Sequence, residues 1–393
     1  MKLLTTNSAG NDIFGGIHTR KTEQVKNSPT TKFHIVELNS EKSYVSRANC
    51  TVHRLDTAAC TEGRGLFGIL NTAQTFPEFD QGVERLVNEF QNIIRDERPD
   101  VILIPGTSLT SYLLFKAARR EQVLHRTMQE YAGVLEKEIG NYSGNQRYIL
   151  EQVGKVFVSP VARNHVTYLF PSEVCKKVVE EIHNVQLERA HIVWNGVSEE
   201  FFPVHPSRKA PNELTLGYIG RVHHVKNLPF FLNLNSGREY PARLKIITDL
   251  ASAMGKTTSK ILVRKLTDGE VYYYAPRPKT ELAQFYATEL SASVVSSFFE
   301  TYCNGAVESL VCGTPCLLSD RAGATEVFEH YGMRDLIYST DDMSSFNRSL
   351  EAARNMDFKV DEDVSKRMSE DLSWKKVIGK YQKIAEEVVA NPR

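Results

Sequence analysis

Short apolar runs alternate along this chain with longer stretches in which apolar residues recur every three or four positions. Residues 82–95 show the second pattern, because Val83, Leu86, Val87, Phe90 and Ile94 fall on one face of a helix. The apolar runs predict strands, which in the first half of the chain cover Lys2–Thr5, Phe33–Leu38, Thr51–Leu55, Val101–Ile104, Val156–Val158 and His191–Trp194. Such alternation of strands and helices favours an open parallel sheet with helices on both faces.

The alternation is interrupted around Phe202–Leu214. This segment contains three prolines and no apolar periodicity, which is typical of a linker. Further strands are then predicted at Thr215–Ile219, Leu244–Ile247, Val271–Tyr274, Ser293–Ser296 and Cys316–Leu318, and a last helix at Trp374–Val389. We therefore predict an α/β fold of two tandem Rossmann-like domains that face each other across a cleft, with residues 1–203 in the first domain, 204–372 in the second and 373–393 in a C-terminal helix.

Composition and charge narrow the class of protein further. The 393 residues exceed one ordinary core and suit two domains. Lys+Arg and Asp+Glu number 48 each, and the resulting net charge of zero argues against a dedicated nucleic-acid binder. The six cysteines include no CxxC pair, which indicates free thiols in a reducing compartment. Because no apolar run is long enough for a signal peptide or a transmembrane helix, we expect a soluble, cytoplasmic protein.

A candidate anion site lies at the start of the helix predicted over Cys303–Cys312. The first residues of this helix are Cys303, Asn304 and Gly305. The N-terminus of a helix presents unpaired backbone N–H groups and a partial positive charge, which suit a diphosphate. We expect these three residues to take part in binding a phosphate-containing ligand.

Two glutamates flank this helix start. Glu300 follows the predicted strand Ser293–Ser296, and Glu308 lies about one turn into the helix. Either side chain alone would ordinarily be a solvated surface charge. Because both stand where a strand ends and a helix begins, Glu308 is well placed for the diol of a ribose and Glu300 for the hydroxyls of a second sugar. Together with the diphosphate site, they predict a nucleotide sugar as ligand.

A second cluster follows the first strand after the linker. Arg221 and Lys226 come directly after Thr215–Ile219, at the carboxyl end of that strand. Two fixed cations can bind a diphosphate and stabilise the charge that develops on it as it leaves. Parallel strands direct their carboxyl ends to one edge of the sheet, so we expect these cations to lie near Glu300 and Glu308.

Weaker candidates are scattered along the chain. Gly15 and Gly16 follow the first strand, where paired glycines allow backbone N–H groups to approach a phosphate, although an ordinary turn explains them equally well. His125 is a candidate for a position after another strand, and a plain surface or core histidine is the alternative. Arg277 is included among the candidates for donor binding.

Taken together, these residues resemble the retaining GT-B glycosyltransferases of family 4, also called glycosyl transferases group 1. The segment Glu300-Thr-Tyr-Cys-Asn-Gly-Ala-Val-Glu308 looks like the E-x7-E signature of that group, and Gly220-Arg221 with Lys226 looks like its GR…K motif. Residues 191–204 are similar to the segment that ends its N-terminal domain. Residues 371–384 resemble its C-terminal helix, which crosses back to that domain.

The resemblance implies transfer of a sugar from a nucleotide-diphosphate sugar to an acceptor hydroxyl, with retention of configuration and without a metal or other cofactor. Arg221, Lys226 and the helix N-terminus would hold the diphosphate, Glu300 would orient the donor sugar and Glu308 the ribose. The acceptor would be a carbohydrate, a lipid-linked glycan or a small molecule. The sequence departs from the family at Cys303, where glycine is usual, and at Thr248-Asp249-Leu250, which replace a glycine-rich strand exit.

Three alternatives remain open at this point. The chain could be a GT-B phosphorylase, a nucleotide-sugar epimerase, or a GT-B subunit that binds ligand without turnover. Contact with the inner face of a membrane is a further alternative, since the basic cluster Lys116–Arg120 could dock on anionic lipid, although a solvated helix face is the simpler reading.

Overall fold

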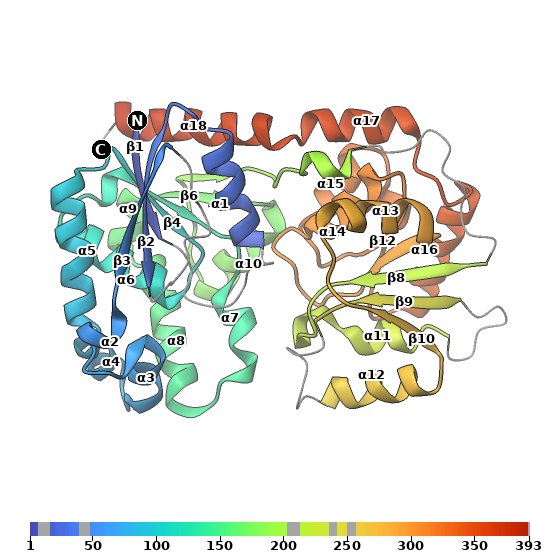
Figure 1. Ribbon diagram of the computed structural model, residues 1–393, viewed down its shortest axis with the longest axis horizontal. Helices are drawn as coiled ribbons and strands as arrows, with labels where there is room; N and C mark the ends of the chain where they lie inside the picture. Colours follow the sequence, from blue (N-terminus) through green and yellow to red (C-terminus); the bar gives the residue numbers. More distant parts are fainter. Residues whose placement is uncertain (7–15, 39–47, 203–212, 236–241, 250–256, 392–393) are drawn as a thin grey trace. The chain divides into compact units, whose positions relative to one another are not determined.

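The computed structural model describes residues 1–6, 16–38, 48–202, 213–235, 242–249 and 257–391. These residues form two compact units, each of which is described by itself (Figure 1). Unit 1 comprises Met1–Trp194 and Trp374–Arg393, and unit 2 comprises Asn195–Ser373. No helix in the described ranges has both the length and the apolar character needed to span a membrane.

Unit 1 is built on a seven-stranded sheet in the order β3-β2-β1-β4-β5-β6-β7, with all pairs parallel. Its strands are β1 (Lys2–Thr6), β2 (Lys32–Leu38), β3 (Cys50–Leu55), β4 (Val101–Pro105), β5 (Thr127–Glu130), β6 (Thr167–Phe170) and β7 (Ala190–Ile192). Its helices are α1 (Gly16–Lys26), α2 (Thr57–Cys60), α3 (Gly65–Thr72), α4 (Phe76–Gly82), α5 (Glu84–Glu97), α6 (Leu109–Arg120), α7 (Leu135–Glu138), α8 (Gly144–Phe157), α9 (Pro160–His165), α10 (Glu173–His183) and α18 (Trp374–Ala390), with short 3₁₀ turns η1 (Leu124–Arg126) and η2 (Ile139–Asn141).

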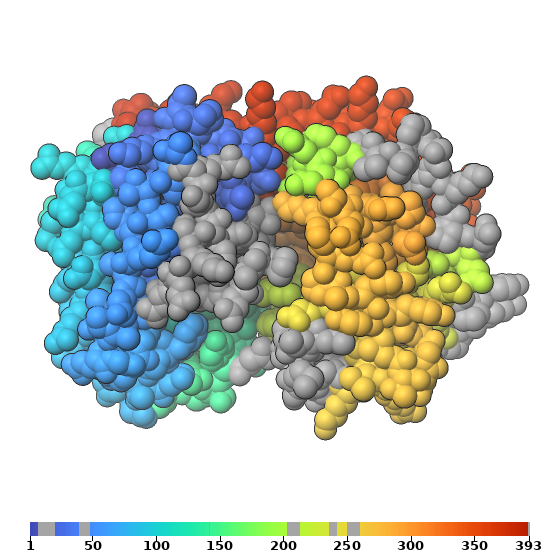
Figure 2. Space-filling model, viewed as in Figure 1, coloured from blue at the N-terminus to red at the C-terminus, as the bar shows by residue number. Residues whose placement is uncertain are grey.

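The last helix of the chain, α18, completes the core of unit 1. Its apolar stripe packs on alternate residues of the strands, so that one buried cluster contains Leu3, Phe33, Val101, Leu103, Met128, Trp374, Val377, Ile378 and Tyr381. The intervening strand residues, such as Leu4 and Ile102, are also buried. Burial on both faces is the pattern expected of a parallel sheet. α5 lies at the surface, in light blue to cyan in Figure 2, and its apolar stripe is buried as predicted.

Unit 2 contains a six-stranded parallel sheet in the order β10-β9-β8-β11-β12-β13. The strands are β8 (Thr215–Ile219), β9 (Arg243–Ile247), β10 (Val271–Tyr274), β11 (Ala292–Val295), β12 (Cys316–Ser319) and β13 (Ile337–Tyr338). The helices are α11 (Leu228–Leu232), α12 (Thr257–Thr267), α13 (Lys279–Glu289), α14 (Asn304–Val311), α15 (Thr325–His330), α16 (Met343–Asn355) and α17 (Glu362–Asp371), with the 3₁₀ turns η3 (Glu199–Phe201), η4 (His224–Lys226) and η6 (Arg334–Leu336).

The predicted fold class, α/β with two Rossmann-like domains, is confirmed by these two sheets. One predicted strand, Val156–Val158, is wrong: Val156 and Phe157 belong to α8, in which Ile149, Leu150, Val153 and Phe157 form the buried face. Apolar residues that recur with a helical period over residues 144–157 therefore indicate secondary structure more reliably than the short apolar run at its end. Strands β5, β6 and β13 were not predicted.

The two units meet along the chain between Trp194 and Asn195, several residues before the predicted boundary at residue 203. Residues 195–201 pack within unit 2, where the Val197 N–H donates to the Leu372 carbonyl at 2.7 Å and Phe201 is buried. The proline-rich residues 203–212 of the predicted linker lie outside the described ranges.

Candidate functional site

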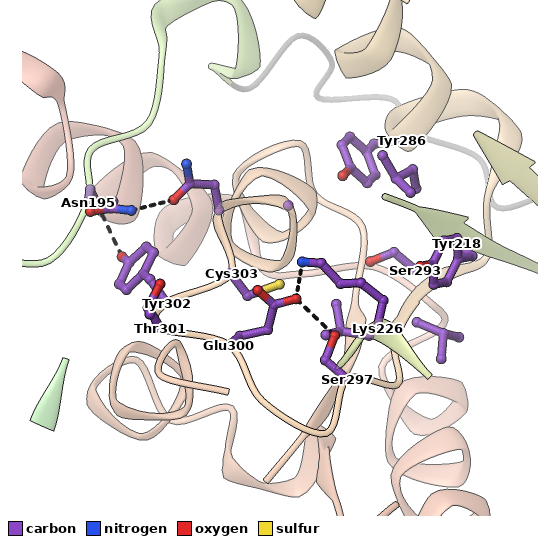
Figure 3. A pocket seen from close by; sticks show the side chains of 15 residues that line it. Asn195, Tyr218, Lys226, Tyr286, Ser293, Ser297, Glu300, Thr301, Tyr302 and Cys303 are labelled. Carbon is purple, nitrogen blue, oxygen red and sulfur yellow. Dashed lines mark hydrogen bonds and ion pairs between the residues drawn. The ribbon is translucent and has the colours of Figure 1, made fainter. Parts of the chain in front are cut away.

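A pocket of about 200 Å³ opens in unit 2 beside the neighbouring strands β8 and β11. The strand order reverses between these two strands, because β9 and β10 lie on one side and β12 and β13 on the other. Open parallel sheets bind ligands at such switch points, outside the carboxyl ends of the strands. Residues of the loop after β11 and of the start of α14 line the pocket together with Lys226 (Figure 3).

The central contact in the pocket is an ion pair between Lys226 and Glu300. Lys226 ends the turn η4 after β8, and Glu300 lies in the loop after β11, where its backbone pairs with that of Ala322. The Ser297 hydroxyl donates to the same carboxylate oxygen at 2.9 Å. The two charged side chains are 22% and 13% exposed, so the pair is accessible to a ligand yet largely shielded from water.

The environment keeps Lys226 charged. Burial by itself would lower the pKa of Lys226, but the neighbouring Glu300 carboxylate outweighs burial, and the pKa is raised. The amine therefore remains an ammonium at neutral pH and can act as a cation toward an anionic ligand.

Arg221 lies close to this pair but is more exposed. The backbone is held here by the Tyr218 hydroxyl, which donates to the Arg221 carbonyl at 2.9 Å. The guanidinium is near enough to lower the pKa of Lys226, although less strongly than burial does. Among the described residues the pocket lining includes Lys226 and not Arg221. The two cations lie near each other, as the sequence analysis predicted, but only Lys226 lines the pocket.

The start of α14 forms another side of the pocket, as the sequence predicted. Cys303, Asn304 and Gly305 all line it. The helix begins at Asn304, and Cys303 precedes it with φ +87° and ψ +76°. A Cβ atom on Gly305 would lie only 3.3 Å from the Tyr286 hydroxyl, so glycine permits a close approach here.

Cys303 occupies a backbone conformation that favours glycine. A left-handed conformation costs a non-glycine residue roughly 1–2 kcal/mol. Replacing Cys303 by glycine removes this cost, but part of the gain is offset because glycine has more conformational entropy in the unfolded chain. We expect Cys303→Gly to raise the free energy of unfolding by about 0.5–1 kcal/mol. Urea unfolding of the variant and the wild type checks this, and a loss of stability would show that the thiol is needed for packing.

The sequence analysis did not single out three further lining residues as site residues, and two of these, Asn195 and Tyr302, connect the pocket to the start of unit 2. The Asn195 side-chain amide donates a hydrogen bond to the Asn304 side-chain oxygen at 2.7 Å. The Tyr302 hydroxyl donates to the Asn195 carbonyl at 3.3 Å. Ser297 supports Glu300 as described above. Two of these positions carried a signal in the sequence: Asn195 lies in the segment 191–204 that resembles the family, and Ser297 follows a predicted strand beside Glu300.

Glu308 lies one turn along α14, on the side of Lys279 and Glu200. It is not among the described residues that line the pocket. Burial raises the pKa of this carboxyl to about 7, with Lys279 opposing the shift and Glu200 adding to it. The predicted placement on the α14 face is correct, and a role toward a ribose remains a prediction.

This raised pKa predicts a pH dependence of stability. Between the ordinary value of 4.5 and about 7, the folded protein holds a proton at Glu308 that the unfolded chain releases. The contribution of this group to stability is therefore lost as the pH rises through that window. We expect Glu308→Gln to be close to wild type at about pH 5 and more stable than wild type at about pH 8, as measured by urea unfolding. An equal difference at both values would contradict the assignment.

The remaining candidates lie elsewhere. Arg277 follows β10, the edge strand, and its guanidinium stacks over the rings of Tyr274 at 4.9 Å and Phe285 at 5.5 Å. It is not among the described lining residues. His125 was expected after a strand, and this is wrong: it lies in η1, directly before β5 and thus at the amino end of that strand. Gly15 lies outside the described residues, and Gly16 begins α1.

The site can therefore offer a fixed cation, a carboxylate and the N-terminus of a helix around one pocket. A cation and backbone N–H groups suit the oxygens of a phosphate, whereas a carboxylate accepts hydrogen bonds from hydroxyl groups. A ligand with both a phosphate and a polyol would satisfy all of them.

Comparison with known proteins agrees with this description. Residues 199–370 match the model of the family Glycosyl transferases group 1, which confirms the resemblance seen in the sequence. No curated protein sequence matches the chain significantly.

Similar solved structures share the fold at low sequence identity. Sucrose-phosphate synthase from Thermosynechococcus elongatus has a TM-score of 0.74 at 12% identity, with 99% of each chain covered. Alr3699/HepE from Anabaena, in complex with UDP and glucose, has a TM-score of 0.68 at 13% identity, with 100% of each chain covered. A protein described as trehalose-6-phosphate from Escherichia coli, bound with UDP-2-fluoro glucose, has a TM-score of 0.64 at 13% identity, with 100% of this chain and 99% of that chain covered.

Proposed function

We propose that this chain moves a sugar from a nucleoside-diphosphate sugar to an acceptor hydroxyl, because residues 199–370 match the model of the Glycosyl transferases group 1 family. The transfer proceeds with retention of the anomeric configuration and without a metal ion. The observation that carries the proposal is the Lys226–Glu300 ion pair at the switch point of the unit 2 sheet, beside the first residues of α14.

Lys226 and the N-terminus of α14 hold the diphosphate, with Arg221 adding charge from the rim. As the bond between sugar and diphosphate breaks, negative charge grows on the leaving phosphate. Fixed positive groups stabilise that charge more than they stabilise the bound donor, which lowers the barrier. In this proposal the ammonium of Lys226 takes over the role that a metal ion would otherwise fill.

Glu300 orients the donor sugar by accepting hydrogen bonds from its hydroxyl groups. In the free protein its carboxylate is paired with Lys226 and with the Ser297 hydroxyl. When a diphosphate binds, Lys226 is shared between two anionic partners, so Glu300 gains freedom to accept from the sugar. Ser297 keeps the carboxylate in place during this exchange.

The pocket holds only part of the donor. Its volume of about 200 Å³ is below the roughly 300–1,000 Å³ that drug-sized ligands occupy. The sugar and the adjacent phosphate fit this space, while the nucleoside extends along α14 toward Glu308. UDP-glucose is the first donor to test, because two similar structures were solved with UDP or a UDP-sugar.

The acceptor is a hydroxyl compound, either a carbohydrate or a lipid-linked glycan. Membrane contact through the basic cluster Lys116–Arg120 is not part of the proposal. Lys116 contacts both Asp80 and Glu84, and Arg120 contacts Glu84, so much of the positive charge of this cluster is neutralised.

A turnover assay tests the proposal. Wild-type protein is incubated with UDP-glucose, other nucleotide sugars and a panel of acceptors in the presence of a chelator, and products are followed by NMR. We expect release of the nucleoside diphosphate and a product whose anomeric configuration equals that of the donor. An inverted product would contradict retention, and release that requires added magnesium would contradict metal independence. Phosphate-dependent cleavage of a disaccharide, without use of any nucleotide sugar, would identify a phosphorylase instead.

A further inference from the structure

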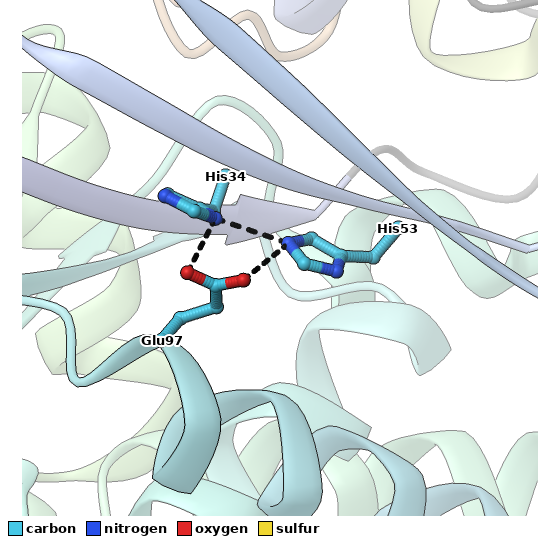
Figure 4. A group of neighbouring side chains, drawn as sticks. All are labelled: His34, His53 and Glu97. Carbon is cyan, nitrogen blue, oxygen red and sulfur yellow. Dashed lines mark hydrogen bonds and ion pairs between the residues drawn. The ribbon is translucent and has the colours of Figure 1, made fainter.

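Three side chains capable of binding a metal converge in unit 1, and none of them lines the unit 2 pocket. They are His34, His53 and Glu97 (Figure 4). The ring nitrogens His34 Nδ1 and His53 Nε2 lie 3.0 Å apart. The Glu97 carboxylate oxygens lie 3.2 Å from His34 Nδ1 and 3.7 Å from His53 Nε2.

The fold holds these groups together through three separate elements. His34 lies on β2 and His53 on the edge strand β3, where the register pairs His34 with Thr51 and Val36 with His53. The two histidines are therefore diagonal neighbours on one face of the sheet, and their rings stack with centroids 5.3 Å apart. Glu97 is the last residue of α5, the helix on that face.

The distances match a metal coordination shell. Zinc binds imidazole nitrogen and carboxylate oxygen at about 2.0–2.2 Å, which places the ligand atoms of a tetrahedral shell about 3.3 Å apart. The contact between the two ring nitrogens at 3.0 Å and that of His34 Nδ1 with Glu97 Oε2 at 3.2 Å lie close to this value. The 3.7 Å contact of His53 Nε2 is with Oε1, the other oxygen of the same carboxylate. We propose that His34, His53 and Glu97 form a binding site for a divalent transition-metal ion, for which zinc is the best fit. Three protein ligands leave a fourth position for water or another small ligand.

Proton counting supports a cation at the centre of the cluster. A neutral histidine carries one ring proton, so a single N–H donated between the two rings leaves the other ring's lone pair facing the Glu97 carboxylate. A metal ion would accept electron density from all three atoms at once.

Two neighbouring features limit the affinity. The Lys2 ammonium lies 3.6 Å from a Glu97 carboxylate oxygen and competes with the metal for it. His34 Nε2 is buried and has no hydrogen-bond partner among the described residues, so the ring lacks the outer hydrogen bond that usually orients a metal-ligating histidine. We therefore expect zinc to bind at micromolar rather than nanomolar concentrations.

A metal ion bound at this site would cross-link secondary-structure elements of unit 1. The site joins the end of α5 to the edge strand β3, so a bound ion would stabilise unit 1 by mass action. It neither depends on the proposed transfer reaction nor shares residues with the unit 2 pocket.

The experiment measures zinc binding to the full-length protein by competition with a chromophoric chelator, together with the absorption spectrum of the cobalt-substituted protein. His53→Gln and Glu97→Gln are the test variants because both positions are partly exposed and tolerate substitution better than the buried His34. His165→Asn, an exposed histidine of unit 1, is the matched control.

We expect one equivalent of zinc in the wild type and in His165→Asn, with at least tenfold weaker binding in His53→Gln and in Glu97→Gln. Cobalt should give the intense visible bands of a four-coordinate site with nitrogen and oxygen ligands. Equal affinity in wild type and His53→Gln would overturn the proposal, as would near-ultraviolet charge-transfer bands showing that cysteine thiolates bind the ion instead.

Discussion

Replacing Lys226 by alanine is expected to lower kcat/KM for sugar transfer by about 10²–10³-fold, the loss found when one fixed donor to a developing oxyanion is removed. Lys226 is the charged group of the pocket that faces Glu300, and its raised pKa keeps it cationic. The effect should fall mainly on kcat, because the charge on the leaving phosphate grows as the bond breaks.

Lys265→Ala is the matched control for this variant. Lys265 also pairs with a glutamate, Glu270, and lies in unit 2, but it does not line the pocket. The control should keep wild-type kinetics. Because Lys226→Ala leaves Glu300 without its cation, circular dichroism and urea unfolding must confirm that the variant is folded. A folded Lys226→Ala protein with wild-type kcat/KM would remove Lys226 from the mechanism.

Replacing Glu130 by glutamine is expected to destabilise unit 1 by about 3–5 kcal/mol, the cost of leaving one charge of a buried pair uncompensated. Arg20 Nη1 lies 2.8 Å from a Glu130 carboxylate oxygen, and the two side chains are only 2% and 1% exposed. The Tyr381 hydroxyl of α18 donates to the same oxygen at 2.7 Å. The pair therefore links α1, β5 and the C-terminal helix in one buried network.

Two controls separate the charge from the hydrogen bonds. Tyr381→Phe removes one hydrogen bond and should cost about 1 kcal/mol. The double variant Arg20→Met with Glu130→Gln removes both charges of the pair and should be more stable than Glu130→Gln alone, because Arg20 is no longer left as a buried charge without its carboxylate. Urea unfolding measures all three. A double variant that is less stable than the Glu130→Gln single variant would contradict this account of the network.

The sequence allowed most of the unit 2 sheet and the centre of its pocket to be predicted. Apolar runs such as Thr215–Ile219 are short and lie between the polar, proline-containing residues 211–213 and Gly220-Arg221, so their length and their boundaries both indicate strands. Glu300 and Lys226 could be placed together because both follow strands of one parallel sheet. What the sequence did not reveal is that they form an ion pair with each other, since this depends on β8 and β11 being neighbours.

The failures have physical reasons too. β5 was missed because three of its four residues, Thr127, Gln129 and Glu130, are polar, although all four are buried. Met128 packs in the apolar core of unit 1, and Glu130 pairs with Arg20. Because β5 was missed, the sequence analysis did not show that His125 directly precedes a strand. The cluster of His34, His53 and Glu97 also has no sequence signature, because its members come from three elements and meet only through strand register and the end of α5.

The most direct test of the central claim is a thermal-shift panel of UDP, GDP, ADP, TDP and CDP on the wild type, Lys226→Ala and Lys265→Ala, with and without magnesium. A nucleotide at a hundred times its dissociation constant adds about 2.7 kcal/mol of stability, which such a scan resolves. We predict that one nucleotide raises the melting temperature of the wild type and of Lys265→Ala without magnesium, and that Lys226→Ala loses most of this shift. If no nucleotide shifts the wild type, or if Lys226→Ala responds as the wild type does, then the pocket beside β8 and β11 is not a donor site.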